Sequence, residues 1–337
     1  MKAVVYSNAG GPDVLRLVER EVPEPGPGEV RVQVRVSGVN PTDWKRRRGG
    51  LTDDFSEQVP NQDGAGVIDA VGPGVDAGRV GQRVWVWQAA YQRSGGTAQE
   101  YATLPERLAV PLPDDASFDL GAALGVPALT AHRALTVADG GPAQLAPGAL
   151  TGRTVLVAGG AGAVGNGAIQ LARWAGARVI TTVSSREKAE LATAAGAQHV
   201  VNYRESDPAG AIRALAPDGV NLIVEVAASA NAALDQAVAA NNAAIAFYAD
   251  DGATEFTIAI RPAMVANLRW QGVLLYTIEE AAKDAAVAAV RAAVGDGAIR
   301  VGEEAGLPLH RFALEEASAA HAAVENHVVG KVLIDVG

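Results

Sequence analysis

The feature that most constrains the fold is a glycine-rich segment directly after a short apolar strand. The stretch TVLVAGGAGAVGNGAIQLARW covers residues 154–174, and three of its glycines have the spacing G-x-G-x-x-G. Such glycines allow a tight turn and let backbone N–H groups approach a pyrophosphate at the start of a helix. A further strand, RVITTV at 178–183, completes the context that this motif requires. The sequence therefore predicts a Rossmann-type domain whose phosphate loop contains Gly159, Gly160, Gly162, Ala163, Val164 and Gly165.

The end of the second strand favours NADPH over NADH. A site for NADH usually carries Asp or Glu about 20 residues after the first glycine, where the carboxylate binds the ribose hydroxyls. Here the strand is followed by Ser184, Ser185 and Arg186, with Lys188 close behind. Hydroxyl groups and cations suit the 2′-phosphate of NADPH, which a carboxylate would repel. The alternative interpretation is that Arg186 and Lys188 are solvated helix residues.

The two parts of the chain have different periodicities. Up to about residue 120, short valine-rich runs alternate with Gly and Pro, and EVRVQVRV at 29–36 places its valines on one face. Many short strands of this kind predict a barrel-like β domain. From about residue 124, apolar strands alternate with alanine-rich helices, which predicts a parallel sheet covered on both faces. The stretch WQGVLLYT at 270–277 is expected to be one more strand.

Composition excludes several classes of partner and chemistry. The formal net charge of −10 argues against nucleic acid and anionic membrane surfaces, because both select a basic face. The absence of cysteine excludes disulfides, thiolate catalysis and thiolate-bound metals. No apolar stretch reaches the roughly 20 residues that a membrane helix needs, and MKAVVYSNAGG is not typical of a signal peptide. We therefore expect a cytoplasmic location and no membrane partner.

An ordered set of segments resembles the zinc-free quinone oxidoreductases, the zeta-crystallin-like branch of the medium-chain dehydrogenases/reductases. The segments include SGVNPTDWKRRRG (37–49), QDGAGVIDAVGPGV (62–75), GVPALTAHRAL (125–135), AGGAGAVGNGAIQLA (158–172) and GKVLIDV (330–336). The resemblance implies an α/β protein with a GroES-like β-barrel catalytic domain, formed by residues 1–123 and 266–337, around a Rossmann NADPH-binding domain at 124–265. It also implies a homodimer, and the apolar segment GVLLY (272–276) would extend the sheet edge across a two-fold axis.

The zinc ligands of related enzymes are missing. Zinc-dependent relatives carry Cys-His after the first Gly-Val and Gly-His-Glu before Gly-Ala-Gly, whereas this chain has Asn40-Pro41 and Asn61-Gln62-Asp63. The five histidines (132, 199, 310, 321 and 327) show no metal-ligand spacing and are expected to be surface or capping residues. We expect no metal. Without a Lewis acid, alcohol dehydrogenation is disfavoured, and the expected acceptor is a quinone or an alkene conjugated to a carbonyl.

The resemblance also implies roles for individual residues. Asn40 and Asp43 would lie near the nicotinamide, where Asn40 can donate from its amide and Asp43 either takes part or only fixes the loop. The remaining matches are Thr130 near the nicotinamide ribose, Tyr203 near the 2′-phosphate, and Phe247 and Tyr248 where backbone approaches the nicotinamide. The basic run at 45–48 either attracts an anionic substrate such as an acyl-CoA or forms a solvated loop.

Three functions remain open from the sequence. The leading interpretation is a metal-free, NADPH-dependent reductase of quinones or enones. The second is an enoyl-thioester reductase acting on an acyl chain carried by CoA or a carrier protein. The third is an NADPH-binding protein with a crystallin-like structural or redox-sensing role, because fold does not determine function.

Overall fold

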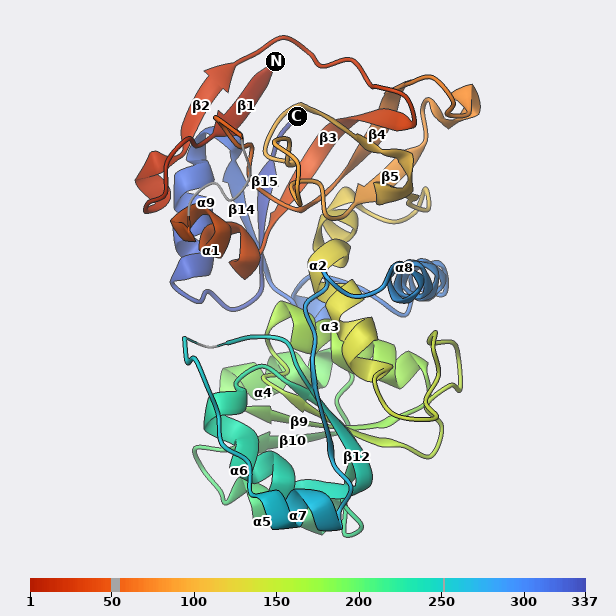
Figure 1. Ribbon diagram of the computed structural model, residues 1–337, viewed down its shortest axis with the longest axis vertical. Coiled ribbons are helices and arrows are strands. Elements are labelled where there is room, and N and C mark those ends of the chain that lie inside the picture. Colours follow the sequence, from red (N-terminus) through yellow and green to blue (C-terminus); the bar gives the residue numbers. More distant parts are fainter. Residues whose placement is uncertain (50–54, 251) are drawn as a thin grey trace. The chain divides into compact units, whose positions relative to one another are not determined.

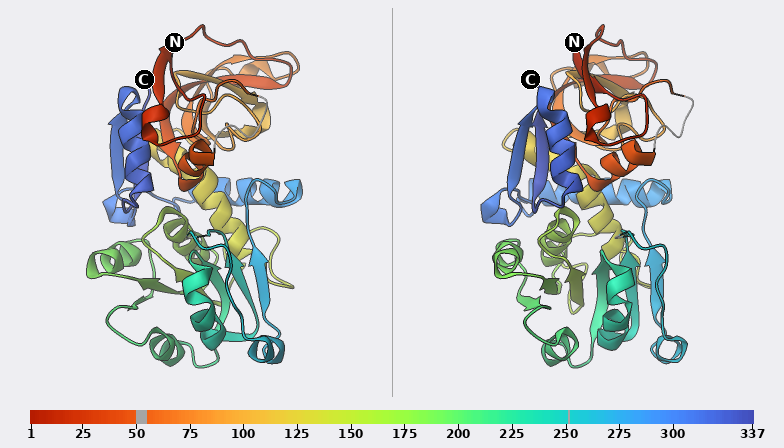
Figure 2. Two further views of the ribbon diagram at one scale, coloured as in Figure 1. Left: turned by 60° about the vertical axis from the view of Figure 1, so that its left-hand side comes forward. Right: turned by 90° about the vertical axis from the view of Figure 1, so that its left-hand side faces the viewer.

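The computed structural model describes residues 1–49, 55–250 and 252–337, which divide into two compact units (Figures 1 and 2). The first unit comprises Met1–Val126 and Pro308–Gly337, so it contains both ends of the chain; the second is Pro127–Leu307. The sequence-based boundary after residue 265 thus differs from the observed division. The reason lies in α3 (Ala163–Trp174), where the Asn166 amide donates to the carbonyl of Ala305 (2.8 Å) and the Gln170 amide to that of Arg300 (3.0 Å). These bonds hold residues 300–305 in the second unit.

The second unit contains a parallel sheet with the strand order β10-β9-β8-β11-β12-β13. Its strands are β8 (Thr154–Ala158), β9 (Arg178–Val183), β10 (His199–Asn202), β11 (Val220–Glu225), β12 (Ala239–Phe247) and β13 (Arg269–Gly272). Its other helices are α4 (Arg186–Ala194), α5 (Pro208–Leu215), α6 (Ala228–Val238), α7 (Ile260–Val265), α8 (Glu280–Gly295) and η4 (Glu303–Ala305). When the six strands are numbered from one to six in chain order, their order in the sheet is 3-2-1-4-5-6, which is the strand order of a Rossmann fold. The predicted nucleotide-binding fold is confirmed.

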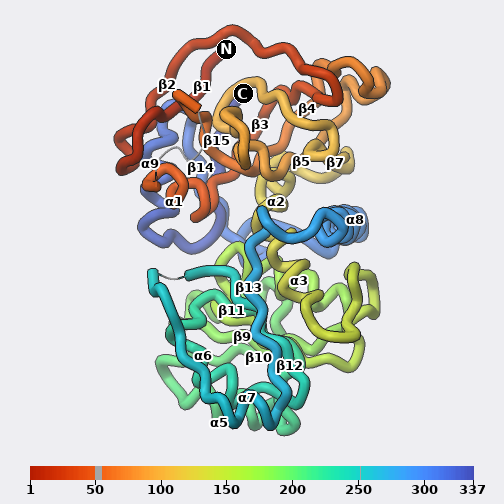
Figure 3. The backbone as a smooth tube through the Cα atoms, viewed as in Figure 1, coloured from red at the N-terminus to blue at the C-terminus, as the bar shows by residue number. Residues whose placement is uncertain are grey.

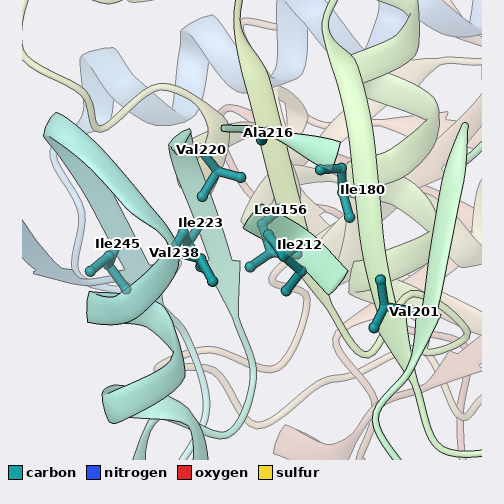
Figure 4. Close-up of a cluster of buried hydrophobic side chains, with 9 residues drawn as sticks. All are labelled: Leu156, Ile180, Val201, Ile212, Ala216, Val220, Ile223, Val238 and Ile245. Carbon is teal, nitrogen blue, oxygen red and sulfur yellow. The ribbon is translucent and has the colours of Figure 1, made fainter. Parts of the chain in front are cut away.

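Apolar runs in the strands form the core of this unit. Figure 4 shows nine buried side chains, contributed by β8–β12 and by α5, α6 and the residue after α5: Leu156, Ile180, Val201, Ile212, Ala216, Val220, Ile223, Val238 and Ile245. Each fully buried Leu, Ile or Val contributes about 1.5–3 kcal/mol of hydrophobic stabilisation. The continuous apolar strands are therefore explained by burial against helices.

The last strand is shorter than expected. β13, whose backbone course can be followed in Figure 3, pairs with β12 at one edge of the sheet and ends at Gly272 rather than at residue 277. Its neighbour β12 ends at Phe247, whose carbonyl accepts the Val273 N–H (2.9 Å). Beyond that point the described residues offer no strand to pair with, and Thr277 instead closes a turn onto the Leu274 carbonyl (3.0 Å). The prediction of a strand through WQGVLLYT was wrong for residues 273–277.

The first unit is built on a mainly antiparallel sheet in the order β14-β15-β3-β4-β5-β7, with β6 also paired to β3. These strands are β3 (Glu29–Val39), β4 (Asp63–Val71), β5 (Arg83–Val86), β6 (Tyr101–Pro105), β7 (Ala109–Pro111), β14 (Leu309–Ala313) and β15 (Lys331–Asp335); β1 (Lys2–Val5) and β2 (Arg16–Glu19) form a separate pair. The helices are η1 (Pro12–Val14), α1 (Pro41–Gly49), η2 (Ala77–Arg79), η3 (Glu106–Leu108), α2 (Phe118–Leu135, which crosses the unit boundary), η5 (Leu314–Glu316) and α9 (Ala317–Glu325).

Strand β3 follows the period-2 pattern predicted for it. Val30, Val32, Val34 and Val36 are buried, while the residues between them are partly exposed. The C-terminal strand β15 pairs with the end of β3 that leads into α1. The sheet therefore brings residues from both ends of the chain together, as the predicted GroES-like domain requires. Within the described ranges, no helix combines the length and apolar character needed to span a membrane.

Candidate functional site

The glycine loop after β8 needs glycine at several positions for steric reasons. Gly159 has φ of +71°, and a Cβ atom on Gly160 would lie 2.2 Å from the Thr181 hydroxyl oxygen. A Cβ on Gly165 would lie 2.4 Å from the carbonyl oxygen of Gly159. Gly162 is the N-cap of the 12-residue helix α3 and offers no side-chain acceptor to its first N–H groups. The loop therefore presents free N–H donors and the positive end of the helix dipole, which together suit a pyrophosphate.

The residues expected to bind the 2′-phosphate separate into two groups. The Lys188 ammonium donates to the Ser184 hydroxyl (3.1 Å), so these two side chains meet at the end of β9. Ser185 caps α4, its hydroxyl accepting the Lys188 N–H (3.3 Å). Arg186 points into solvent, with 86% of its side chain exposed, and pairs with Glu190 (3.3 Å). The structure thus brings Ser184 and Lys188 together and leaves Arg186 apart.

Three further cofactor candidates lie at the same edge of the sheet. Tyr203 follows β10, and its N–H donates to the Val183 carbonyl at the end of β9 (3.1 Å); the residue is 48% exposed. Phe247 ends β12 and packs edge-to-face on Phe256 (5.3 Å between ring centroids). The Tyr248 N–H donates to the Glu225 carbonyl (3.1 Å). These bonds join the carboxyl ends of neighbouring strands, the edge at which Rossmann folds bind nucleotides. Thr130 is placed differently, buried in α2.

A buried polar cluster in the first unit contains Asn40. The Asn40 amide nitrogen donates to the Asp63 carboxylate (2.7 Å), and its amide oxygen accepts from the Lys331 ammonium (2.6 Å). The ammonium also lies 3.7 Å from the Asp63 carboxylate. Each of the three residues is at most 2% exposed. Asn40 precedes α1, Asp63 begins β4 and Lys331 begins β15, so three separate elements form this Asn40–Asp63–Lys331 cluster.

Asp43 fixes the loops that carry this cluster. One of its carboxylate oxygens accepts the backbone N–H of Asn40 (2.7 Å) and the other that of Gln62 (3.2 Å). The first bond is half of a capping box at the start of α1. Asp63 in turn accepts the Val126 N–H (2.9 and 3.0 Å to its two oxygens). The segments around residues 40, 62 and 126 are therefore held in one arrangement.

Burial dominates the electrostatics of these groups. Burial, followed by the negative charge of Asp63, raises the pKa of Asp43 to about 7. Burial also raises the pKa of Asp63, against the opposing effects of the Lys331 charge and the Asn40 hydrogen bond. The pKa of Lys331 is lowered for the same reason, although both carboxylates oppose the change. Because Asp63 accepts two N–H donors besides facing the ammonium, we assign it and Lys331 as an ion pair at neutral pH.

Two expectations about polar residues were wrong. His132 and His321 are buried rather than on the surface; the nitrogen Nε2 of His321 hydrogen bonds with the Asn61 amide oxygen (2.9 Å), and burial lowers its pKa to about 3. In the basic run, Arg47 is also fully buried, with its guanidinium donating to the Gly10 carbonyl and to Glu325 (3.0 Å). Specific partners distant in sequence compensate the burial of His321 and Arg47. Arg47 therefore belongs neither to a solvated loop nor to an exposed basic patch.

A pair of buried carboxyl groups in the second unit was not predicted from the sequence. Glu225, the last residue of β11, and Asp235 of α6 are both buried. The Asn231 amide donates to both oxygens of Glu225 (3.0 and 3.3 Å), and burial and the charge of Glu225 raise the pKa of Asp235 to about 9. The raised pKa favours the protonated form of Asp235, and the bonds from Ala227 and Asn231 to Glu225 join the end of β11 to the start of α6. The one local signal was a glutamate at the end of an apolar strand.

Known proteins match the chain over nearly its full length. The alcohol dehydrogenase GroES-like domain family matches residues 26–114 and the zinc-binding dehydrogenase family residues 163–291. The chain is 31% identical to a quinone oxidoreductase of Lama guanicoe over 337 residues, covering 99% of this chain and 97% of the relative. A quinone oxidoreductase of Rattus norvegicus is 36% identical over 238 residues, covering 70% and 69%.

Solved structures give the same result for the fold. A mycobacterial protein complexed with NADPH has a TM-score of 0.82 and 30% identity, with 99% of both chains covered. A structure described as an NAD-dependent alcohol dehydrogenase has a TM-score of 0.85, also at 30% identity and with both chains fully covered.

The residues at the metal position of zinc-binding relatives do not fit zinc here. Among the residues that the structure describes, no group of three or more His, Cys, Asp or Glu side chains is arranged to hold a metal ion. The Lys331 ammonium already lies against Asn40 and Asp63, and its positive charge would repel a metal cation. We therefore assign no step to zinc.

Proposed function

Because the chain belongs to the quinone oxidoreductase family of the medium-chain dehydrogenases/reductases, we propose that it is a metal-free reductase that uses NADPH to reduce a quinone or an α,β-unsaturated carbonyl. The contact between Lys188 and Ser184 at the end of β9 is the observation that supports NADPH over NADH. Related quinone oxidoreductases, and the mycobacterial structure complexed with NADPH, support the same reaction.

The second unit supplies the groups that would bind the cofactor. The N–H groups of the glycine loop and the N-terminus of α3 bind the pyrophosphate. Lys188 and the Ser184 hydroxyl would bind the 2′-phosphate, with Tyr203 also near it, whereas the solvent-exposed Arg186 would contribute only its positive charge. The ends of β11 and β12, with Phe247 and Tyr248, would border the nicotinamide, and Thr130 would lie near its ribose, as the family resemblance implies.

The first unit supplies the polar group for the reaction. When bound, NADPH provides the hydride. The acceptor then carries negative charge on its oxygen, and an amide N–H of Asn40 stabilises this charge. Asp43 acts by positioning Asn40, because both of its carboxylate oxygens are used by backbone N–H groups. The proton that completes the product comes from solvent, and most of the rate enhancement comes from alignment of the reactants.

The function is tested by following the absorbance of the reduced nicotinamide with a small panel of acceptors. The panel contains benzoquinone, phenanthrenequinone, an alkyl enone and crotonyl-CoA, each repeated with NADH and with EDTA. We expect turnover of a quinone or the enone that prefers NADPH and survives EDTA. A marked preference for crotonyl-CoA would instead establish an enoyl-thioester reductase. Binding of NADPH without turnover of any acceptor would contradict the proposal and favour a structural or redox-sensing role.

We also propose that the protein is a homodimer. Ile260, Met264 and Val265 of α7 and Leu274 are apolar and 55–73% exposed. They lie in the segment that contains the edge strand β13. Exposed apolar side chains around an unpaired sheet edge favour association with a second copy of the chain. The cytoplasm remains the expected location.

A further inference from the structure

We propose that Lys331 is a positioning residue for the reduction: its ammonium group, paired with Asp63, fixes and polarises the Asn40 amide so that one N–H is directed to the acceptor oxygen. This inference rests on the proposed function and extends it to a residue almost 300 positions away from Asn40 in the sequence.

The two neighbours of Asn40 determine which way its amide faces. Lys331 can only donate, so the atom 2.6 Å from its ammonium must be the amide oxygen. Asp63 accepts, so the atom 2.7 Å from its carboxylate must be the amide nitrogen. Turning the amide by a half-rotation would place donor against donor on one side and acceptor against acceptor on the other. The orientation therefore depends on Lys331 and Asp63 together.

This orientation leaves one donor for a substrate. An amide nitrogen carries two hydrogens, and Asp63 takes one of them. Among the described residues, the second has no acceptor. Donation from a cation to the amide oxygen withdraws electron density from the group and strengthens its N–H as a donor. Lys331 thus acts on the substrate through Asn40, and its own ammonium remains buried.

The negative charge that develops on the acceptor oxygen during the reaction is stabilised by an N–H donor such as that of Asn40. Hydride transfer forms a C–H bond on the acceptor, breaks a C–H bond of the reduced nicotinamide and moves an electron pair onto the acceptor oxygen. A solvent proton on this oxygen then gives an enol. From an enone the enol tautomerises to the saturated carbonyl compound, and from a quinone the ring carbon loses its proton while the second carbonyl oxygen gains one, which gives the quinol. An N–H that is held in place before the reaction lowers the energy of the oxyanion without further reorganisation.

The decisive variant removes both buried charges together. Lys331→Met alone would leave Asp63 as an unpaired buried carboxylate and is expected to prevent folding. Lys331→Met combined with Asp63→Asn removes both charges of the pair, and the nearby Asp43 carboxylate keeps its two backbone N–H donors. We expect this double variant to keep a cooperative thermal transition and a KM for NADPH within about twofold of the wild type, while kcat falls about tenfold or more. Lys283→Met is the matched control, because Lys283 is a buried, hydrogen-bonded lysine of α8 in the second unit.

A second double variant separates positioning from simple structural support. Lys331→Gln with Asp63→Asn keeps a neutral donor for the Asn40 oxygen, and we expect it to recover part of the lost kcat. A folded Lys331→Met/Asp63→Asn protein with wild-type kcat would overturn the proposal. So would a folded Gln variant that recovers none of the loss.

A binding measurement tests the same idea independently of turnover. The probe is para-nitrophenol, whose absorbance reports ionisation of its oxygen, titrated in the presence of NADP⁺ and wild-type protein. We expect the bound phenol to have a lowered pKa, and this lowering to disappear in the Lys331→Met/Asp63→Asn variant. An equal pKa in both proteins, or no binding to the wild type, would overturn the role of Lys331. Failure of the wild type to reduce any acceptor, by contrast, would contradict the proposed function alone.

Discussion

Replacing Gly165 by alanine tests the phosphate loop most directly. The new Cβ would lie 2.4 Å from the Gly159 carbonyl oxygen and 3.0 Å from the Gly160 Cα. Ordinary contacts begin at 3.4 Å, so the loop backbone must move by about 1 Å (3.4 − 2.4). Overpacking of this kind costs about 1–3 kcal/mol. The moving atoms belong to the loop that binds the pyrophosphate, so we expect the Kd for NADPH to rise about 5- to 150-fold.

Gly167→Ala is the matched control on the same helix. A Cβ there would meet its nearest neighbours, Ala128 and Ala131, at 3.7 Å, which is ordinary contact. Alanine also favours the helix over glycine by about 0.5–1 kcal/mol. We expect this variant to bind NADPH normally and to melt at a slightly higher temperature.

The assay is titration of nicotinamide fluorescence with both proteins and both cofactors. Since NADPH and NADH share the pyrophosphate, Gly165→Ala should weaken both to a similar extent. A Gly165→Ala protein that binds NADPH within about twofold of the wild type would refute the steric reasoning. Equal weakening by Gly167→Ala would show that the effect belongs to the helix and not to the loop.

Three further predictions concern cofactor choice, pH and assembly. Lys188→Ala should raise the Kd for NADPH about 10- to 150-fold and leave the Kd for NADH unchanged, because a charge-assisted hydrogen bond contributes about 1.5–3 kcal/mol. Arg186→Ala should raise the Kd for NADPH clearly less. Equal effects of the two substitutions would show that the 2′-phosphate binds elsewhere. Folded His321 stays neutral down to a pKa of about 3, whereas the unfolded chain takes up a proton near pH 6.5, so stability is lost as pH falls. Urea denaturation should show about 2 kcal/mol less stability at pH 5 than at pH 7 from this residue, and His321→Gln should remove that part of the slope. Light scattering at micromolar concentration should give the mass of a dimer for the wild type and a lower mass for Met264→Glu. Val80→Glu, which changes an exposed apolar residue of the first unit, should leave the dimer mass unchanged. A monomeric wild type would contradict the proposed dimer.

Local patterns explain why the nucleotide-binding half could be predicted. The glycine spacing, the apolar strands and the Ser184–Lys188 segment all act within a few residues, so the sequence contains the necessary information. The end of β13 was missed because it depends on where the neighbouring strand stops. The burial of Arg47 and His321 was missed for a related reason: each is compensated by a partner more than 250 positions away, Glu325 and Asn61 respectively. The Asp63–Lys331 pair likewise forms only when β15 joins the sheet.

The buried ion pairs of the first unit differ in whether they leave a hydrogen-bond donor free for a substrate. The Arg47 guanidinium donates to Gly10 and Glu325, and this pairing joins α1 to α9. The Asp63–Lys331 pair, in contrast, encloses an amide that retains one donor. Replacing a buried ion pair by apolar side chains of similar volume is often neutral or stabilising by about 1–4 kcal/mol. Stability alone therefore gives little reason to keep a buried lysine and aspartate at this place. The need to orient the Asn40 amide explains why the lysine and aspartate are kept. We therefore predict that a well-packed apolar replacement of the pair would yield a stable protein that binds NADPH but reduces its acceptor slowly.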